Sequence, residues 1–214
     1  LDGMIIYNPF HSIGLFSVFD TDIMRNADIY TGGFNAEYGG RISSIMDITT
    51  RDGNKKRVSG KLGISPFGAK ALIEGPIIRA KELGGSSVSF IFSGKTSYLE
   101  QSSKAVYSYM DNAKDTSALF NTWDAPPTGN LPFNYTDLYG KVSVNGSNGS
   151  KLNLFGFNFR DRVNYVGLTD MNWNSYGGGS NFLIIPGSSE ALVEGVFAYS
   201  KYDISMIEGD DPEK

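Results

Sequence analysis

The chain offers little material for covalent chemistry. It has one His, His11, and no Cys. Without thiols it can form no disulfide, no Cys-ligated zinc site and no thiol nucleophile, and a single imidazole leaves metal binding to carboxylates. No Ser-His-Asp or Cys-His arrangement and no pair of carboxylates stands in an interpretable catalytic frame. We expect no enzyme activity, no cofactor-binding residues and no metal site, and we assign His11 a structural role.

A few polar residues near the N-terminus have two interpretations. Asp2 and Asp47, with Glu37 and Arg41, could line a binding site. The structural alternative, which we favour, is that Asp2 supports the Asp-Gly turn and that Glu37 pairs with Arg41. The doublets Gly32-Gly33 and Gly39-Gly40 do not fit a phosphate-binding motif, so we interpret them as tight turns.

Composition points to β structure. The 214 residues include 26 Gly, 14 Phe and 12 Tyr, and the formal charge is -4. Because there is no basic excess to hold a polyanion, we exclude nucleic acid as a partner. No run reaches the roughly 18 apolar residues of a membrane-spanning helix, whereas a membrane-spanning strand needs only alternation at period two.

A charged turn near residue 55 divides the chain into two regions with different expected secondary structure. Residues 1–55 read as a small, loop-rich α+β unit, with a helical turn over 20–25 and strands over 27–31 and 41–49. Beyond the turn we expect about seven alternating strands. They lie within residues 58–65, 69–75, 87–95, 135–144, 151–160, 176–185 and 191–205.

The clearest alternation lies in residues 87–95. Val88, Phe90 and Phe92 share one face, Ser89 and Ser93 lie on the other, and Ile91 is the misfit. For residues 151–160 the alternation does not show which face is the apolar one, because the Leu residues lie on one face and the Phe residues on the other. The loops also alternate in length: 101–131 is long, whereas 145–150 and 186–189 are short, a pattern typical of outer-membrane barrels.

Aromatic residues gather at the expected strand ends. We interpret five of them as an interfacial girdle and leave Trp123 as a candidate ligand contact in the long loop. The five are Tyr98, Tyr107, Tyr109, Phe133 and Tyr135.

Two ordered motifs carry a family resemblance. The segment LDGMIIYNPFH begins at Leu1, and GGFNAEYGGRISSIMDITTRDG spans residues 32–53. In order and spacing they resemble the plug of TonB-dependent outer-membrane receptors, in the form common in Bacteroidetes. The fragments LIEGP at 72–76, SGKTSY at 93–98 and YSKYD at 199–203 resemble early barrel strands of the same group.

The resemblance implies a mainly β fold, with a partial α+β plug followed by antiparallel strands of a transmembrane β-barrel. Residues 1–55 would be the C-terminal part of the plug, and residues 56–214 would be about seven of roughly 22 barrel strands. Because seven strands cannot close such a barrel, and the family's signal peptide, TonB box and first plug half are missing, we expect an internal piece of a longer chain. The implied plug-motif residues, structural or gating, are Asp2, Gly3, Asn8, Pro9, Gly32, Gly33, Glu37, Tyr38, Gly39, Gly40 and Arg41.

The resemblance also implies a bacterial outer-membrane receptor that imports a nutrient by energised displacement of the plug. Its cargo would be a siderophore, cobalamin, glycan or peptide. Its partners would be the TonB complex, reached through the missing N-terminal segment, outer-membrane lipid and a surface lipoprotein.

Two other hypotheses stay open. The chain could be a soluble or surface-attached β-sandwich that serves as a binding or adhesion module, which would bury the apolar faces of its strands and expose the polar ones. It could also be a fragment whose sheet is completed by another chain at an exposed edge.

Overall fold

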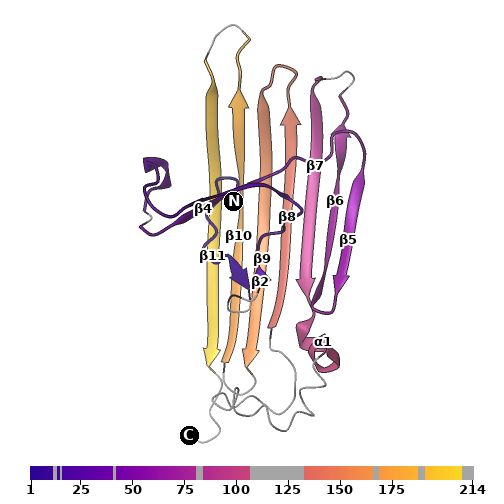
Figure 1. The fold of residues 1–214 in the computed structure, drawn as a ribbon, viewed down its shortest axis with the longest axis vertical. Helices are drawn as coiled ribbons and strands as arrows, with labels where there is room; N and C mark the ends of the chain where they lie inside the picture. Colours follow the sequence, from indigo (N-terminus) through magenta and orange to yellow (C-terminus); the bar gives the residue numbers. More distant parts are fainter. Residues whose placement is uncertain are drawn as a thin grey trace, which may run out of the picture.

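A single antiparallel sheet dominates the molecule (Figure 1). The computed structural model describes residues 1–11, 14, 16–40, 42–80, 84–106, 133–165, 169–187 and 191–208. Seven strands pair in sequence order, which confirms the expected mainly β class and the number of strands in this region. They are β5 (Ser59–Ser65), β6 (Gly68–Ile78), β7 (Ser87–Ser97), β8 (Phe133–Asn145), β9 (Lys151–Tyr165), β10 (Thr169–Ile184) and β11 (Val193–Glu208).

The strands are longer than their apolar alternation indicates. β10 begins at Thr169, seven residues before the predicted start at Tyr176. The added residues are mostly polar, so they lack the apolar alternation of a half-buried strand. They are nevertheless paired on both sides, since Asn172 lies opposite Arg162 of β9 and Ser205 of β11. Cross-strand backbone pairing thus extends the strand beyond its apolar part.

The expected loop at 101–131 begins with a helix instead. Helix α1 spans Leu99–Val106, and Ser97 Oγ accepts a hydrogen bond from the Leu99 backbone N–H at 3.3 Å. A Ser oxygen at this place satisfies one of the free N–H groups of the first helical turn. Leu99 packs with Phe133 and Val163 in a small buried cluster. Residues 107–132, which contain Tyr107, Tyr109 and Trp123, lie outside the described residues.

The described part of residues 1–55 contains two short hairpins and no α-helix. The hairpins pair β1 (Phe10–His11) with β2 (Phe16–Ser17) and β3 (Met24–Tyr30) with β4 (Ile45–Thr50), and η2 (Ala36–Tyr38) is a 3-10 turn. The expected α+β character is therefore not present there. The helical turn predicted over 20–25 is wrong, because Asp20 Oδ1 accepts the Asp22 N–H at 3.0 Å and so forms a tight turn from which the chain enters β3.

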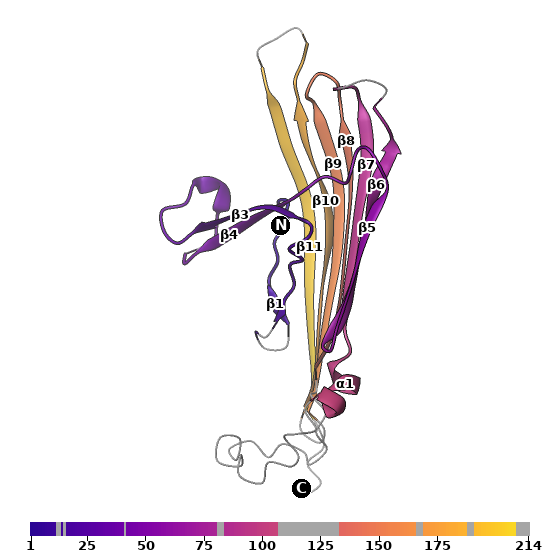
Figure 2. The same cartoon turned by 45° about the vertical axis from the view of Figure 1, so that its right-hand side comes forward.

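Residues 1–55 lie on one face of the sheet (Figure 2). We call this the inner face and the opposite one the outer face. The alternation predicted for β7 holds, because Ser89 and Ser93 are buried on the inner face and Phe92 is 45% exposed on the outer face. Ile91, the misfit in that pattern, is buried on the inner face in the core against residues 1–55.

The ambiguous frame of β9 is resolved in the same way. Its Phe residues are buried on the inner face, and its Leu residues are exposed on the outer face. The main core therefore lies between the N-terminal segment and the inner face. It comprises Leu1, Met4, Val18, Ile23 and Ile48 of the segment with Leu72, Ile91, Tyr139, Phe155, Phe157 and Phe159 of the sheet.

Candidate functional site

The inner interface, formed where residues 1–55 meet the inner face, holds an unusual number of buried polar groups. Asp2 is 6% exposed, and its carboxylate accepts the Thr50 N–H at 2.9 Å, the Thr50 hydroxyl at 2.7 Å and the Tyr139 hydroxyl at 2.6 Å. Lys141 Nζ donates to the Thr50 carbonyl at 3.0 Å and lies 3.8 Å from the Asp2 carboxylate. This cluster joins the start of the chain, the end of β4 and strand β8.

The segment that leads from β4 to β5 is fixed by ion pairs on both sides. Arg51 forms a two-pronged salt bridge with Glu74 of β6, at 2.5 and 3.1 Å. Asp52 pairs with Lys151 of β9 at 2.7 Å. Burial would raise the pKa of Asp52, but the Lys151 hydrogen bond and neighbouring lysine charges outweigh burial and lower the pKa. In the same segment, Gly53 packs directly on the Phe90 backbone carbonyl of β7, which leaves no room for a Cβ.

His11 lies between two carboxylates of the sheet. Its Nε2 is 2.8 Å from Asp137 and its Nδ1 is 3.5 Å from Asp161, while its ring stacks on Tyr135 with 4.4 Å between centroids. Burial alone would lower the pKa of His11, but the hydrogen bonds and charges of the two carboxylates outweigh it and raise the pKa. Lys95 Nζ, 3.2 Å from Asp137, adds a second positive charge, so a protonated His11 balances the cluster.

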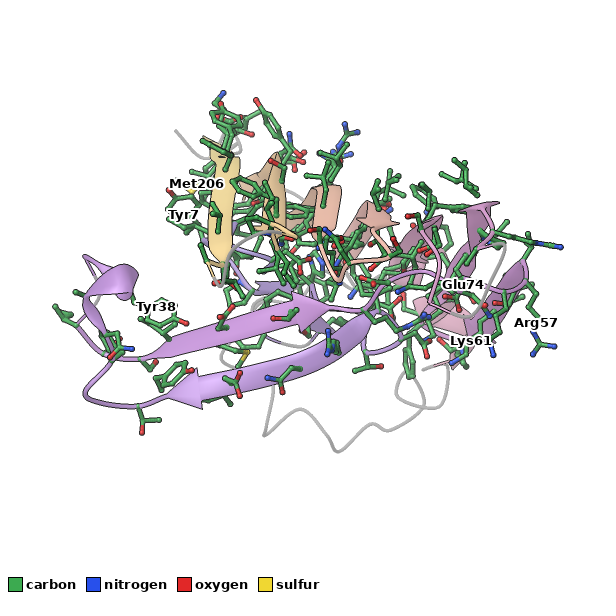
Figure 3. All side chains as sticks on the ribbon, turned by 90° about the horizontal axis from the view of Figure 1, so that it is seen from above. Tyr7, Tyr38, Arg57, Lys61, Glu74 and Met206 are labelled. Carbon is green, nitrogen blue, oxygen red and sulfur yellow. The ribbon has the colours of Figure 1, made fainter. Side chains whose placement is uncertain are left out.

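The turn before β3 makes a fourth polar contact. Asp22 pairs with Lys61 of β5 at 2.7 Å and with Lys70 of β6 at 2.5 Å, and Asp20 accepts a hydrogen bond from the Ser93 hydroxyl. Hydrogen bonds from Lys61 and Lys70 lower the pKa of Asp22 to about 2. Figure 3 shows Lys61 and Glu74 at the β5–β6 edge of the sheet, toward which the open end of the β3–β4 hairpin points.

The predicted residues around Asp2 and Asn8 take part in this interface. Asp2 and Gly3 form a turn with φ of 49° and 91°, which explains a glycine at the second position. A Cβ at position 3 would also overlap the Val196 side chain of β11. Asn8 Oδ1 accepts the Phe10 N–H at 3.2 Å, and the Pro9 carbonyl accepts the Val18 N–H at 3.1 Å.

The predicted residues from 32 to 41 lie elsewhere, in the connection between β3 and β4. Gly33 and Gly40 have positive φ, as tight turns require, while Gly32 and Gly39 are exposed. Tyr38 donates to Asp47 at 3.1 Å. The Glu37 side chain, Arg41 and Trp123 fall outside the described residues, so the Glu37–Arg41 pairing and the Trp123 ligand contact stay predictions.

The girdle interpretation is wrong for two of its aromatic residues. Tyr135 stacks on His11, and Phe133 packs in the buried Leu99 cluster, so both rings point inward. Odd-numbered residues of β8 face inward. Phe133 and Tyr135 have odd numbers, so the alternation of the sequence already placed their rings on the same face as Asp137 and Lys141. Tyr98 donates its hydroxyl to the Ser65 carbonyl.

Sequence reasoning missed most partners in this interface. The signal was present in part, since charged residues occupy inner-face positions of several strands. They are Lys61, Lys70, Glu74, Lys95, Asp137, Lys141 and Asp161. Such charges require opposite charges when they are covered, but the sequence did not identify the partners.

The inner interface is closed rather than hollow. A cavity between the segment and the sheet, bordered by Asp20, Lys95 and Tyr139, measures about 10 Å³. That volume suits at most a single water molecule. Among the described residues no group of His, Asp or Glu is placed to hold a metal ion. The arrangement holds residues 1–55 against the inner face through ion pairs, hydrogen bonds and the apolar core.

The outer face has the opposite character. In the described structure its large apolar side chains are uncovered, and they run across all seven strands. Exposed examples are Leu62, Ile64, Ile73, Phe92, Leu138, Val144, Leu152, Leu154, Ile184, Val193, Phe197 and Tyr199. We call these residues the apolar band.

No described helix has both the length and the apolar character needed to span a membrane. Scans against protein-family models, curated proteins and solved structures gave no match.

Proposed function

We propose that this chain is part of a TonB-dependent outer-membrane receptor that imports a nutrient. In this proposal residues 1–55 belong to the plug, and β5–β11 are strands of the barrel wall. The outer face meets lipid, and the inner face lines the lumen that the plug fills.

The observation that carries the proposal is the inverted polarity of the sheet. Buried charges and hydroxyls lie on the covered inner face, while the uncovered outer face bears the apolar band. An exposed apolar surface of this extent is a liability in water, but it is what a wall strand presents to lipid. β6 and β7 have 11 residues each, close to the roughly 9–11 that a tilted strand needs to cross a bilayer.

The chemistry of the inner interface supports a plug that can be displaced. Ion pairs such as Arg51–Glu74 and Asp22–Lys61 hold the segment in place. When such groups separate into a wet lumen they regain water, which offsets much of the lost attraction. A polar interface can therefore seal the lumen and still open under force.

The apolar band argues against the β-sandwich hypothesis. A sandwich would cover its apolar face with a second layer and expose the polar face. Here the described residues cover the polar face, through contacts such as His11–Asp137 and Asp2–Tyr139. The proposal follows the resemblance in its cargo, which would be a siderophore, cobalamin, glycan or peptide, and in its force source, the TonB complex. It requires no covalent chemistry.

Fractionation and uptake test the function together. Cells that carry the gene should hold the protein in the outer membrane and accumulate one labelled nutrient from a panel of the four cargo classes. Deletion of the gene should abolish that uptake, and so should a protonophore, because the transport is energised. Recovery in the soluble fraction, or uptake that persists after deletion for every cargo, would contradict the proposal.

A further inference from the structure

A groove of about 470 Å³, lined mostly by residues with polar side chains, lies along β8, β9 and β10. Its outer-face side chains belong to positions beyond the apolar band, toward the ends of these strands. They include Thr136, Asn158, Arg160, Arg162, Asn172 and Asn174. None of them was predicted as a site residue, and the plug-displacement function does not use them.

The strand register aligns these residues in two rows. Thr136 lies opposite Arg160, which lies opposite Asn174. In the next row, Arg162 lies opposite Asn172. The groove therefore presents two guanidinium groups flanked by side-chain amides. Asn158 already donates one hydrogen bond to Asn174 at 3.0 Å and Asn172 donates one to Asp170 at 3.3 Å, and each amide has a second N–H.

The charge of the groove is positive. Arg162 is neutralised by Asp170, with contacts of 3.2 and 2.6 Å. Arg160 is exposed and forms no ion pair with any residue that the structure describes. A guanidinium matches the oxygens of a phosphate with paired hydrogen bonds. An amide donor beside it, as at Asn174, suits further phosphate or sugar oxygens.

The position of the groove beside the apolar band indicates which kind of anion it would bind. Most of its lining residues are outer-face positions, while Tyr135, Asp161 and Trp173 line it from inner-face positions, and Tyr135 and Asp161 also contact His11. Leu138, a member of the apolar band, lines its edge, and Leu154 lies farther along the same face. A ligand with an anionic head and an apolar tail would bind the groove and the band at once.

We propose that this groove binds the phosphate-bearing headgroup of a membrane lipid, whose acyl chains lie along Leu138 and Leu154. The proposal rests on the proposed function, because it requires the outer face to meet lipid. Arg160 supplies the principal charge, and the amides of Asn158 and Asn174 position the headgroup.

Native mass spectrometry of the protein extracted from cell membranes in mild detergent tests this. The probes are lipid A, dephosphorylated lipid A and inorganic phosphate. Arg160→Gln should weaken lipid A binding about tenfold, the loss expected for one charge-assisted hydrogen-bonding group. Arg57→Gln is the matched control, since it removes the same charge from an exposed turn far from the groove, and should leave binding unchanged.

Each outcome bears on the proposal. Weaker binding of dephosphorylated lipid A, with no competition from inorganic phosphate, supports a lipid headgroup. Equal binding by Arg160→Gln and the unsubstituted protein overturns the lipid site, while the membrane location stands. Binding of inorganic phosphate as tight as that of lipid A overturns the lipid part in favour of a free-anion site. Recovery of the protein from the soluble fraction overturns the proposed function and the lipid site together.

Discussion

At the scale of single residues, the Asp2 cluster should dominate the stability of the inner interface. Asp2→Asn removes a buried charge that accepts three hydrogen bonds and leaves Lys141 buried without its nearest carboxylate. Breaking one partner of a buried pair costs about 3–5 kcal/mol. We expect residues 1–55 to become protease-sensitive at a lower temperature than in the unsubstituted protein.

The exposed residue Asp28 provides the control for that substitution. Asp28→Asn makes the same chemical change on β3, where the carboxylate accepts a hydrogen bond from the Asn26 side chain and is open to solvent. It should shift the protease-sensitive temperature little. Equal shifts for Asp2→Asn and Asp28→Asn would show that the buried cluster contributes nothing special.

His11 should make the docking of the β1–β2 hairpin depend on pH. The pKa of His11 is raised in the folded protein, so the folded state holds the proton more tightly than the unfolded chain does. The stabilisation is complete below the ordinary His pKa and is lost as the pH rises through the folded-state value. Hydrogen exchange of amides near His11 should therefore speed up, beyond the intrinsic change, as the pH rises above the ordinary His pKa.

His11→Gln isolates that effect. The amide keeps hydrogen-bonding capacity toward Asp137 but does not titrate in this range. The excess pH dependence should vanish in this variant. If it persists at full size, another group controls the docking.

At the scale of elements, the segment between β4 and β5 should tolerate no side chain at position 53. A Cβ on Gly53 would overlap the Phe90 backbone carbonyl, so Gly53→Ala must push the segment off β7. Overpacking of this kind costs roughly 1–3 kcal/mol. The same change at Gly187, which has open space around it, should be neutral in thermal unfolding. Equal unfolding temperatures for the two variants would contradict this close packing.

A charged side chain on the outer face should reduce membrane assembly only where it replaces a residue of the apolar band. Leu154 and Asn164 lie on β9 and face the same way, but only Leu154 belongs to the band. Leu154→Arg should reduce the amount of protein assembled in the membrane, because an arginine facing lipid near the midplane costs about 2–4 kcal/mol. Asn164→Arg should assemble normally. If both variants assemble equally well, the band does not contact lipid.

Element faces were predictable because they depend on local alternation. The β7 pattern of Val88, Phe90 and Phe92 against Ser89 and Ser93 identified both faces correctly. The boundaries were less predictable, since Thr169–Ser175 of β10 pairs through its backbone despite mostly polar side chains. The helical turn over 20–25 failed for a related reason, because an Asp20 side chain can cap a tight turn as well as a helix.

Partners within the inner interface were not predictable in the same way. His11 and Asp137 are 126 residues apart, and Asp2 and Tyr139 are 137 apart. Nothing in the local sequence couples them. Only the fold of residues 1–55 onto the inner face brings them together.

At the scale of the whole molecule, the described sheet has two faces of different polarity and two open edges. The described sheet has β5 at one edge and β11 at the other, each without a further strand. In a bilayer, unpaired strand edges cost several kcal/mol for each exposed backbone group. The proposed receptor therefore requires additional strands from the rest of a barrel, which these seven would adjoin.

The most direct test is the depth of spin labels placed one at a time along β9 in outer membranes, measured by oxygen and water-soluble quenchers. These 214 residues contain no Cys, so no native thiol among them competes with the introduced one for the label. Labels at 152 and 154 should be accessible to oxygen dissolved in lipid, and labels at 160 and 162 to the water-soluble quencher. The inner-face position 157 should be protected from both. Access of the water-soluble quencher at 152 and 154 equal to that at 160 and 162 would contradict a lipid-facing outer surface.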